Sequence, residues 1–325
     1  MTETFWKRPP TQAELESLAP WLQVHDFGSV QTQVPPGSEQ APQFFAARAA
    51  LLQEILGVLE PGVEEKTLLE LGCASGLHCF TAAARHWQAT GLDPREHHIR
   101  QASFLGGLVA EGFPPPRFQV GSDRLLHTLE GQWGVSLCYN VLQVLGNPGE
   151  TLKDLRQRSR YALILETPVY TPPCPEPIFI PGNNWLYQAS CQITNHGALK
   201  HHKKGIEDFA LVLSFPALVY LLFQAGFAAV AYLTPPSHWQ GSGSRGLEGF
   251  FTGHQHLLVA TTASLPREKL QVPQTWVWLS QAPEPPNYDY AGPWGSTASP
   301  ARRPHPLVQA LGRKLMAWGR RLGGQ

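Results

Sequence analysis

The chain has 325 residues; 42% of them are hydrophobic, only 15% are charged, and 25 Lys and Arg residues balance 25 Asp and Glu residues. This length suits one large domain, or a core domain with additions. A protein that lives on nucleic acid usually carries a basic surplus that neutralises phosphates, and the sequence has no global surplus. It also lacks a run of about 18 apolar residues, so we expect no membrane span.

The five cysteines favour reduced thiols over a disulfide framework, because none forms a C-x-x-C pair and the chain is too long to need such staples. The first residues lack the apolar core of a signal peptide. Together these features predict a soluble, cytoplasmic protein.

The predicted elements begin with a short helix in which Thr11 and Glu14 fit a capping box. A second helix is predicted over about 43–59 from apolar residues at helical spacing. From there strands at 67–72, 88–93, 117–122, 135–142 and 161–167 alternate with helices at about 77–86, 95–111, 124–129 and 151–159. Such alternation is typical of a parallel sheet with helices on both faces, which binds ligands beyond the carboxyl ends of its strands.

After the fifth strand the alternation stops, and a proline-rich stretch is followed by mixed sequence. A helix is predicted over 214–227, with Ser214 as its N-cap, and strands are predicted over 228–233 and 256–261. We expect these two strands, which a Gly/Ser-rich loop at 240–253 connects, to close the sheet as an antiparallel pair.

These elements divide the chain into three parts. An N-terminal cap segment covers 1–42, the α/β core covers 43–262 with an insertion at 185–213, and a Pro-rich linker with a basic amphipathic helix covers 263–325. One face of that final helix holds Leu307, Leu311, Leu315, Trp318 and Leu322. Three interpretations of the helix stay open: it packs back on the domain, it binds a protein partner or a second copy, or it lies on an anionic membrane surface.

The segment LLELGCASGLHCF, at 68–80, reads as a strand that ends in Glu70 and turns through Gly72 and Gly76 into a helix. Glycines at such a turn permit positive φ angles and let a ligand approach the backbone. The helix N-terminus offers free N–H groups. G-x-x-x-G by itself is equally typical of an ordinary corner between a strand and a helix.

Two later strands are also followed by acidic residues, which favours the ligand-binding interpretation. Asp93 ends the second strand, 23 positions after Glu70, where a carboxylate can bind both ribose hydroxyls. Asp123 follows the third strand. The G-x-G-x-x-G pattern is absent, with Ala74 where its second glycine would stand, and this disfavours a nicotinamide dinucleotide.

These motifs resemble those of the class I S-adenosylmethionine-dependent methyltransferases over roughly residues 43–262. The resemblance implies a Rossmann-like fold with a mixed seven-stranded sheet and S-adenosylmethionine as cofactor. It also implies that Asp93 holds the ribose and that Asp123 reads the adenine amine. The cofactor-binding residues that it implies are Glu70, Gly72, Cys73, Ala74, Gly76, Asp93, Ser122, Asp123 and Asn140.

More closely, the runs SLCYNVLQVLG and SFPALVYLLFQAGF are similar to a subgroup around the tRNA wobble-uridine methoxylating and carboxymethoxylating enzymes. That subgroup also includes small-molecule and sugar methyltransferases. Related proteins often carry V-L-Y-H-L after the fourth strand, whereas Gln143 and Val144 stand here in place of the tyrosine and the histidine. No catalytic base is therefore carried over from the resemblance.

A general base is needed only where the methyl acceptor is a protonated nucleophile such as a hydroxyl. The candidates that follow the fifth strand are Tyr170, Tyr187, His196, His201 and His202, and none of them is assigned. The insertion is longer than a simple loop requires, so we expect it to shape the choice of acceptor. His78 and Cys79 indicate helix packing rather than metal binding, because no cluster has the spacing of metal ligands.

The sequence therefore predicts an enzyme that transfers a methyl group from S-adenosylmethionine to oxygen or nitrogen of a small molecule, such as a sugar or a secondary metabolite. Two alternatives stay open. One is an RNA-modifying methyltransferase, which the neutral charge disfavours. The other is a non-catalytic, cofactor-binding scaffold that acts through its tail.

Overall fold

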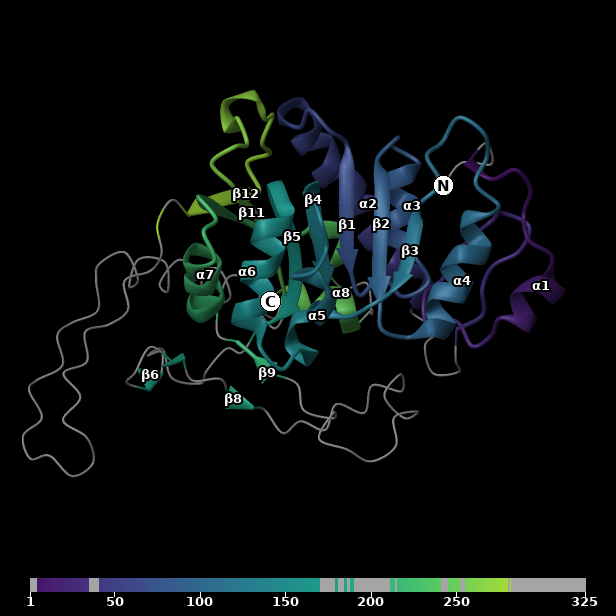
Figure 1. Ribbon diagram of the computed structural model, residues 1–325, viewed down its shortest axis with the longest axis horizontal. Helices are drawn as coiled ribbons and strands as arrows, with labels where there is room; N and C mark the ends of the chain where they lie inside the picture. Colours follow the sequence, from purple (N-terminus) through teal and green to yellow (C-terminus); the bar gives the residue numbers. More distant parts are fainter. Residues whose placement is uncertain are drawn as a thin grey trace, which may run out of the picture.

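The computed structural model describes residues 5–34, 41–169, 179–180, 184–185, 188–189, 211–213, 215–240, 245–251, 255–279 and 281. Within these ranges the chain forms one eight-stranded sheet with helices on both of its faces (Figure 1). Across the same ranges, no helix has the length and the apolar character that a membrane crossing requires.

The order of strands in the sheet is β12-β10-β11-β5-β4-β1-β2-β3. Its strands are β1 (Thr67–Leu71), β2 (Gln88–Asp93), β3 (Arg117–Val120), β4 (Trp133–Tyr139), β5 (Ser159–Pro168), β10 (Ala229–Leu233), β11 (Gln255–Thr261) and β12 (Trp276–Leu279). Strands β1 to β5 are parallel, β11 runs antiparallel to β5 and β10, and β12 runs antiparallel to β10. The chain order reverses at β1, and such a reversal opens a crevice at the carboxyl ends of the strands, where α/β sheets bind ligands.

Helices pack on both faces of this sheet (Figure 1). They are α1 (Gln12–Ser17), α2 (Ala41–Leu59), α3 (Leu77–Ala83), α4 (Glu96–Gly106), α5 (Asp123–Leu126), α6 (Pro148–Arg158), α7 (Phe215–Gln224) and α8 (Arg245–Phe251), with short 3₁₀ helices η2 (Glu60–Gly62), η3 (Leu142–Val144), η6 (Ser237–Trp239) and η7 (Arg267–Lys269). Buried residues of α2, α3 and α8 join one core cluster, and those of α5, α6 and α7 join another.

Two short strand pairs lie outside the main sheet. They are β6 (Phe179–Ile180) with β7 (Asn184–Trp185), and β8 (Gln188–Ala189) with β9 (Leu211–Val212). Strand β9 lies against η3, which directly follows β4. The described end of the expected insertion therefore returns to the carboxyl edge of the sheet.

Most predicted elements are confirmed. At the first helix, Glu14 N donates to Thr11 Oγ1 at 3.2 Å, and Thr11 N donates to Glu14 Oε2 at 2.7 Å, so the capping box is present. The alternation between residues 67 and 167 appears in the predicted order, although α4 ends at Gly106 instead of residue 111. Strands β10 and β11 form the expected antiparallel pair.

Two expectations are wrong. The sheet has eight strands instead of seven, because Trp276–Leu279, in the segment expected to be a linker, pairs with β10. Helix α8 lies where an irregular Gly/Ser-rich loop was expected, and its Leu247 and Phe250 are buried one helical turn apart. The predicted cap Ser214 and the predicted C-terminal helix lie outside the described residues.

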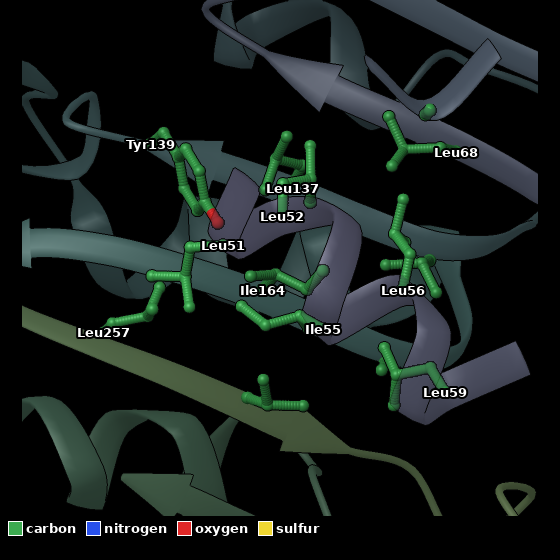
Figure 2. Packing of buried hydrophobic residues seen from close by; sticks show 14 of the residues in the cluster. Leu51, Leu52, Ile55, Leu56, Leu59, Leu68, Leu137, Tyr139, Ile164 and Leu257 are labelled. Atoms are coloured by element: carbon green, nitrogen blue, oxygen red, sulfur yellow. The ribbon is translucent and has the colours of Figure 1, made fainter. Parts of the chain in front are cut away.

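The largest core cluster lies between α2 and the sheet (Figure 2). It includes Leu52, Ile55, Leu56 and Leu59 of α2 with Leu68 of β1, Leu137 of β4 and Ile164 of β5. The four α2 residues follow the spacing of one helix face, so their burial fixes the helix against the strands. Tyr139 lies at one end of the residues drawn, beside Leu51.

The N-terminal segment packs against the core and forms a third cluster. Phe5, Trp6, Trp21 and Phe27 are buried in this cluster together with Phe80 of α3. Several of these rings contact one another edge-on or tilted, with centroids about 5 Å apart. The segment expected to be a cap therefore shares its core with the helix that follows β1.

We expect Leu52→Ala to lower the free energy of unfolding by about 2–5 kcal/mol, because Leu52 is fully buried and its truncation leaves a cavity. Urea denaturation measures the loss. The control is Glu54→Ala, at an exposed position of the same helix, which should change stability by less than about 0.5 kcal/mol. Equal stability of the two variants would contradict the packing of α2 on the sheet.

Candidate functional site

The loop between β1 and α3 lies at the carboxyl edge of the sheet, where the strand order reverses. Gly72, Ala74 and Gly76 adopt positive φ angles of 78°, 48° and 87°. A β-carbon on Gly72 would collide with Val141, and one on Gly76 would collide with the ring of Phe118. Backbone conformation and close packing inside the protein therefore both require these glycines.

Hydrogen bonds tie this loop to the end of β2. Gly72 N and Cys73 N donate to Leu92 O at 2.7 and 2.9 Å. Ala74 N donates to Asp93 Oδ2 at 3.0 Å. The structure thus brings the first sequence motif and Asp93 into direct contact.

Asp93 is fully buried and has several partners. Its Oδ1 accepts from Arg95 N at 2.9 Å and from Arg95 Nε at 3.1 Å, and its Oδ2 accepts from Arg95 Nη2 at 3.3 Å. His98 Nδ1 lies 3.4 Å from Oδ1. Burial by itself would raise the pKa of Asp93, but His98 and Arg95 outweigh it and lower the pKa to about 2. The side chain is therefore an anion at neutral pH.

Glu70 and Cys73, both predicted to contact the cofactor, have buried side chains with partners inside the protein. Glu70 Oε1 lies 2.7 Å from His78 Nδ1, and Glu70 Oε2 accepts from Cys79 Sγ at 3.1 Å. Burial raises the pKa of the Cys73 thiol well above its ordinary value. A ligand at this loop would accordingly meet main-chain atoms rather than these two side chains.

Ser122 and Asp123 lie at the neighbouring strand end. Gly121 N donates to Asp93 O at 3.0 Å, which places the end of β3 beside the end of β2. Ser122 Oγ accepts from the backbone of α5 and caps that helix. Asp123 Oδ2 accepts a long hydrogen bond of 3.4 Å from Thr151 of α6. Both side chains are half-buried.

Asn140 directly follows β4 and has a φ angle of 55°, which is uncommon outside glycine. Its N–H donates to Glu166 O at 2.8 Å, and its Nδ2 donates to Glu166 Oε1 at 3.2 Å. Its Oδ1 accepts from Gln255 Nε2 at 2.8 Å, and its carbonyl accepts from Gln143 Nε2 at 3.0 Å. The protein therefore holds the predicted cofactor residue Asn140 in a single orientation.

A buried ion pair lies next to Asn140, and the sequence analysis missed both partners. Arg48 Nε of α2 donates to Glu166 Oε2 of β5 at 2.8 Å, and their side chains are only 6% and 2% exposed. The Arg48 guanidinium lies 4.7 Å from the ring centroid of Phe44 and 4.9 Å from that of Tyr139. The available signal was a carboxylate inside the apolar run YALILET, since a buried charge requires a partner.

The N-terminal segment also reaches the loop that follows β1. Gln23 Oε1 accepts from Ser75 Oγ at 3.0 Å and from Leu77 N at 3.2 Å. His25 Nε2 lies 2.8 Å from Ser75 Oγ. Because the Ser75 hydroxyl donates to Gln23, we assign the proton of His25 to Nε2, which then donates to Ser75.

The candidates for a catalytic base, Tyr170, Tyr187, His196, His201 and His202, lie outside the described residues. In the part of the chain that the structure describes, no group of three or more His, Cys, Asp or Glu side chains is placed to hold a metal ion. Cys73, Cys79 and Cys138 are free and buried. Burial raises the pKa of Cys138 to about 12, so its thiol is protonated at neutral pH.

Comparison with known proteins identifies the fold. No protein-family model and no curated protein matches the sequence. Among solved structures, the N-terminal domain of EvdMO1 in the presence of SAH and D-fucose is 17% identical, with a TM-score of 0.55, over 77% of this chain and 95% of that one. The same domain with SAH bound gives 18% identity and the same coverage and TM-score. The chain has a Rossmann-like methyltransferase fold.

A further solved structure, geranyl diphosphate methyltransferase in complex with GPP and sinefungin, is 14% identical over 69% of this chain and 80% of that one, with a TM-score of 0.48. At these identities the likeness extends to the fold alone. In the described sheet, β12 lies at the edge next to β10.

We expect stability to fall as the pH drops from about 6.5 towards 3, in part because of His25. Burial, and to a smaller extent the nearby His78, lower the pKa of His25 to about 3. Between that pH and about 6.5, His25 is protonated in the unfolded chain and neutral in the folded chain. The contribution of His25 to the free energy of unfolding is complete above the pKa that His25 has in the unfolded chain. Below that pKa it is lost at up to about 1.4 kcal/mol per pH unit.

Urea denaturation between pH 7.5 and 5 tests this pH dependence. His25→Gln should show a shallower decline than wild type, whereas His238→Gln, at an exposed position of η6, should match wild type. Identical pH profiles for His25→Gln and wild type would contradict the burial of a neutral imidazole.

We expect Arg48→Met to lower the free energy of unfolding by about 3–5 kcal/mol, because it leaves the buried Glu166 carboxylate without its cation. The double variant Arg48→Met/Glu166→Gln should recover a large part of that loss, since neither charge remains. Chemical denaturation of the single and double variants gives the coupling, with Arg100→Met at an exposed site of α4 as control. Additive losses would exclude the ion pair.

Proposed function

We propose that this chain is an S-adenosylmethionine-dependent methyltransferase that transfers a methyl group to oxygen or nitrogen of a small molecule. The observation that carries the proposal is the hydrogen bond from Ala74 N to Asp93. In this fold it sets a buried, anionic carboxylate against the loop that follows β1, at the reversal point of the sheet.

The chemistry of these groups fits an adenosyl cofactor. A carboxylate at the end of β2 can accept hydrogen bonds from a ribose diol. Ser122 and Asp123 lie at the adjacent strand end, within reach of an extended nucleoside, and Asn140 lies across the crevice at the end of β4. The main chain of residues 72–76 would hold the amino-acid end, and Glu70 and Cys73 would support this loop from below. Such a cofactor supplies an activated methyl group, and the protein supplies orientation and removal of water.

The proposed acceptor is a small molecule, such as a sugar or a secondary metabolite. The similar fold of the EvdMO1 domain in the presence of SAH and D-fucose supports this class. The neutral net charge supports it too, because binding of RNA relies on cationic residues. We infer that the insertion shapes the acceptor site, since its strand β9 lies against η3 at the carboxyl edge. The relation to the wobble-uridine subgroup rests on sequence similarity only.

Isothermal titration calorimetry with S-adenosylmethionine and with S-adenosylhomocysteine tests the cofactor. We expect micromolar binding by the wild type and a loss of at least about tenfold in Asp93→Ala, because a charge-assisted hydrogen bond contributes about 1.5–3 kcal/mol. Asp93→Asn keeps the shape of the side chain and should show the same direction of change. Glu111→Ala, at an exposed position, should bind like wild type.

Each outcome of this titration leads to a different conclusion. Absence of binding by a folded wild type would overturn the proposal. Binding followed by methylation of a sugar panel would support it. Binding combined with salt-sensitive affinity for a tRNA probe would move the acceptor to RNA. Binding without turnover on either class would favour a scaffold.

A further inference from the structure

We propose that Arg95 occupies the place of the cofactor ribose in the free protein and must leave Asp93 before a nucleoside binds there. This inference rests on the proposed function, because it takes Asp93 as the ribose-binding residue. It assigns to Arg95 the role of a residue that opposes binding and sets the affinity for the cofactor.

The first argument is that the hydrogen-bonding capacity of Asp93 is filled. An ionised carboxylate offers about four lone-pair positions. Asp93 accepts from Ala74 N, Arg95 N, Arg95 Nε and Arg95 Nη2 at 2.9–3.3 Å, and His98 Nδ1 lies 3.4 Å away. A ribose diol adds two donors, so at least one existing donor has to withdraw.

The second argument is that, among these partners of Asp93, the Arg95 guanidinium with its two donors is the one free to move. Ala74 N and Arg95 N belong to the backbone, within the loop after β1 and at the N-cap of α4. The His98 side chain is 10% exposed and lies inside the fold, whereas the Arg95 side chain is 38% exposed. The guanidinium can therefore rotate into solvent and keep its hydration, while the other partners stay in place.

The third argument concerns the sign of the effect. In the free protein the guanidinium compensates the buried charge of Asp93, and binding of the ribose replaces it with two hydroxyl donors. The state that accepts a ligand is thus only a fraction of the free protein, and the apparent dissociation constant equals the intrinsic constant divided by that fraction. Removing the guanidinium removes the competing state and should tighten binding. If Arg95 instead held the ligand, the same change would weaken binding.

The test is calorimetric titration of S-adenosylhomocysteine into wild type, Arg95→Met, Arg95→Lys and the control Arg100→Met on the exposed side of α4. We expect Arg95→Met to bind about three- to tenfold more tightly than wild type, as a partly exposed ion pair allows. The affinity of Arg95→Lys should lie between those of wild type and Arg95→Met, because an ammonium keeps the positive charge but cannot form the bidentate contact of a guanidinium. Arg100→Met should match wild type.

Two further readouts are independent of catalysis. Without ligand, Arg95→Met should have a lower Tm than wild type, because Asp93 loses a cation, and its Tm should rise more on addition of S-adenosylhomocysteine. The affinity of wild type should also increase from 50 mM to 500 mM salt more than that of Arg95→Met, since salt weakens the attraction between Asp93 and the partly exposed Arg95 guanidinium.

The outcomes separate this inference from the proposed function. Tighter binding by Arg95→Met supports both. Equal or weaker binding by Arg95→Met, in a wild type that binds, overturns the inference and leaves the proposed function standing. If neither wild type nor any variant binds S-adenosylhomocysteine, both are overturned.

Discussion

Burial of carboxylates at the carboxyl edge of the sheet is the constraint on which the rest of the site depends. Glu70, Asp93 and Glu166, near the ends of β1, β2 and β5, are buried. A buried anion is tolerated only when hydrogen bonds or cations compensate it. Each carboxylate is compensated from a different element: Glu70 by α3, Asp93 by the preceding loop and α4, and Glu166 by α2. Polar contacts with these carboxylates, in addition to apolar packing, therefore position helices α2, α3 and α4 on the sheet.

Much of this arrangement was predictable because it rests on local patterns. Alternation of strands with helices is visible within windows of about ten residues, and it implies a parallel sheet whose strand ends share one edge. The proximity of Asp93 to the loop at 72–76 follows from that edge alone. The Thr11 capping box was equally accessible, since its partners lie three residues apart.

The remainder depends on pairs that leave no local pattern. Arg48 and Glu166 are 118 residues apart, and no periodicity links them. The sequence could not show that the Asn140 amide is held by Glu166 and Gln255, which arrive from β5 and β11. Strand β12 was missed because it has only four residues, which are too few to show the alternation that identifies a strand. Its pairing with β10 is a tertiary effect.

The contact of Gln23 and His25 with the loop after β1 has a consequence for the order in which the chain folds. These residues meet Ser75 and Leu77 across 50 to 54 positions of sequence. During synthesis Gln23 and His25 are made before Ser75 and Leu77, so their partners do not exist until β1 and the loop after it have been made. A contact between residues so far apart in sequence forms late in folding, because the chain loses the entropy of closing the loop before the contact stabilises it. The loop thus reaches its final shape only when a segment made some fifty residues earlier has returned to it.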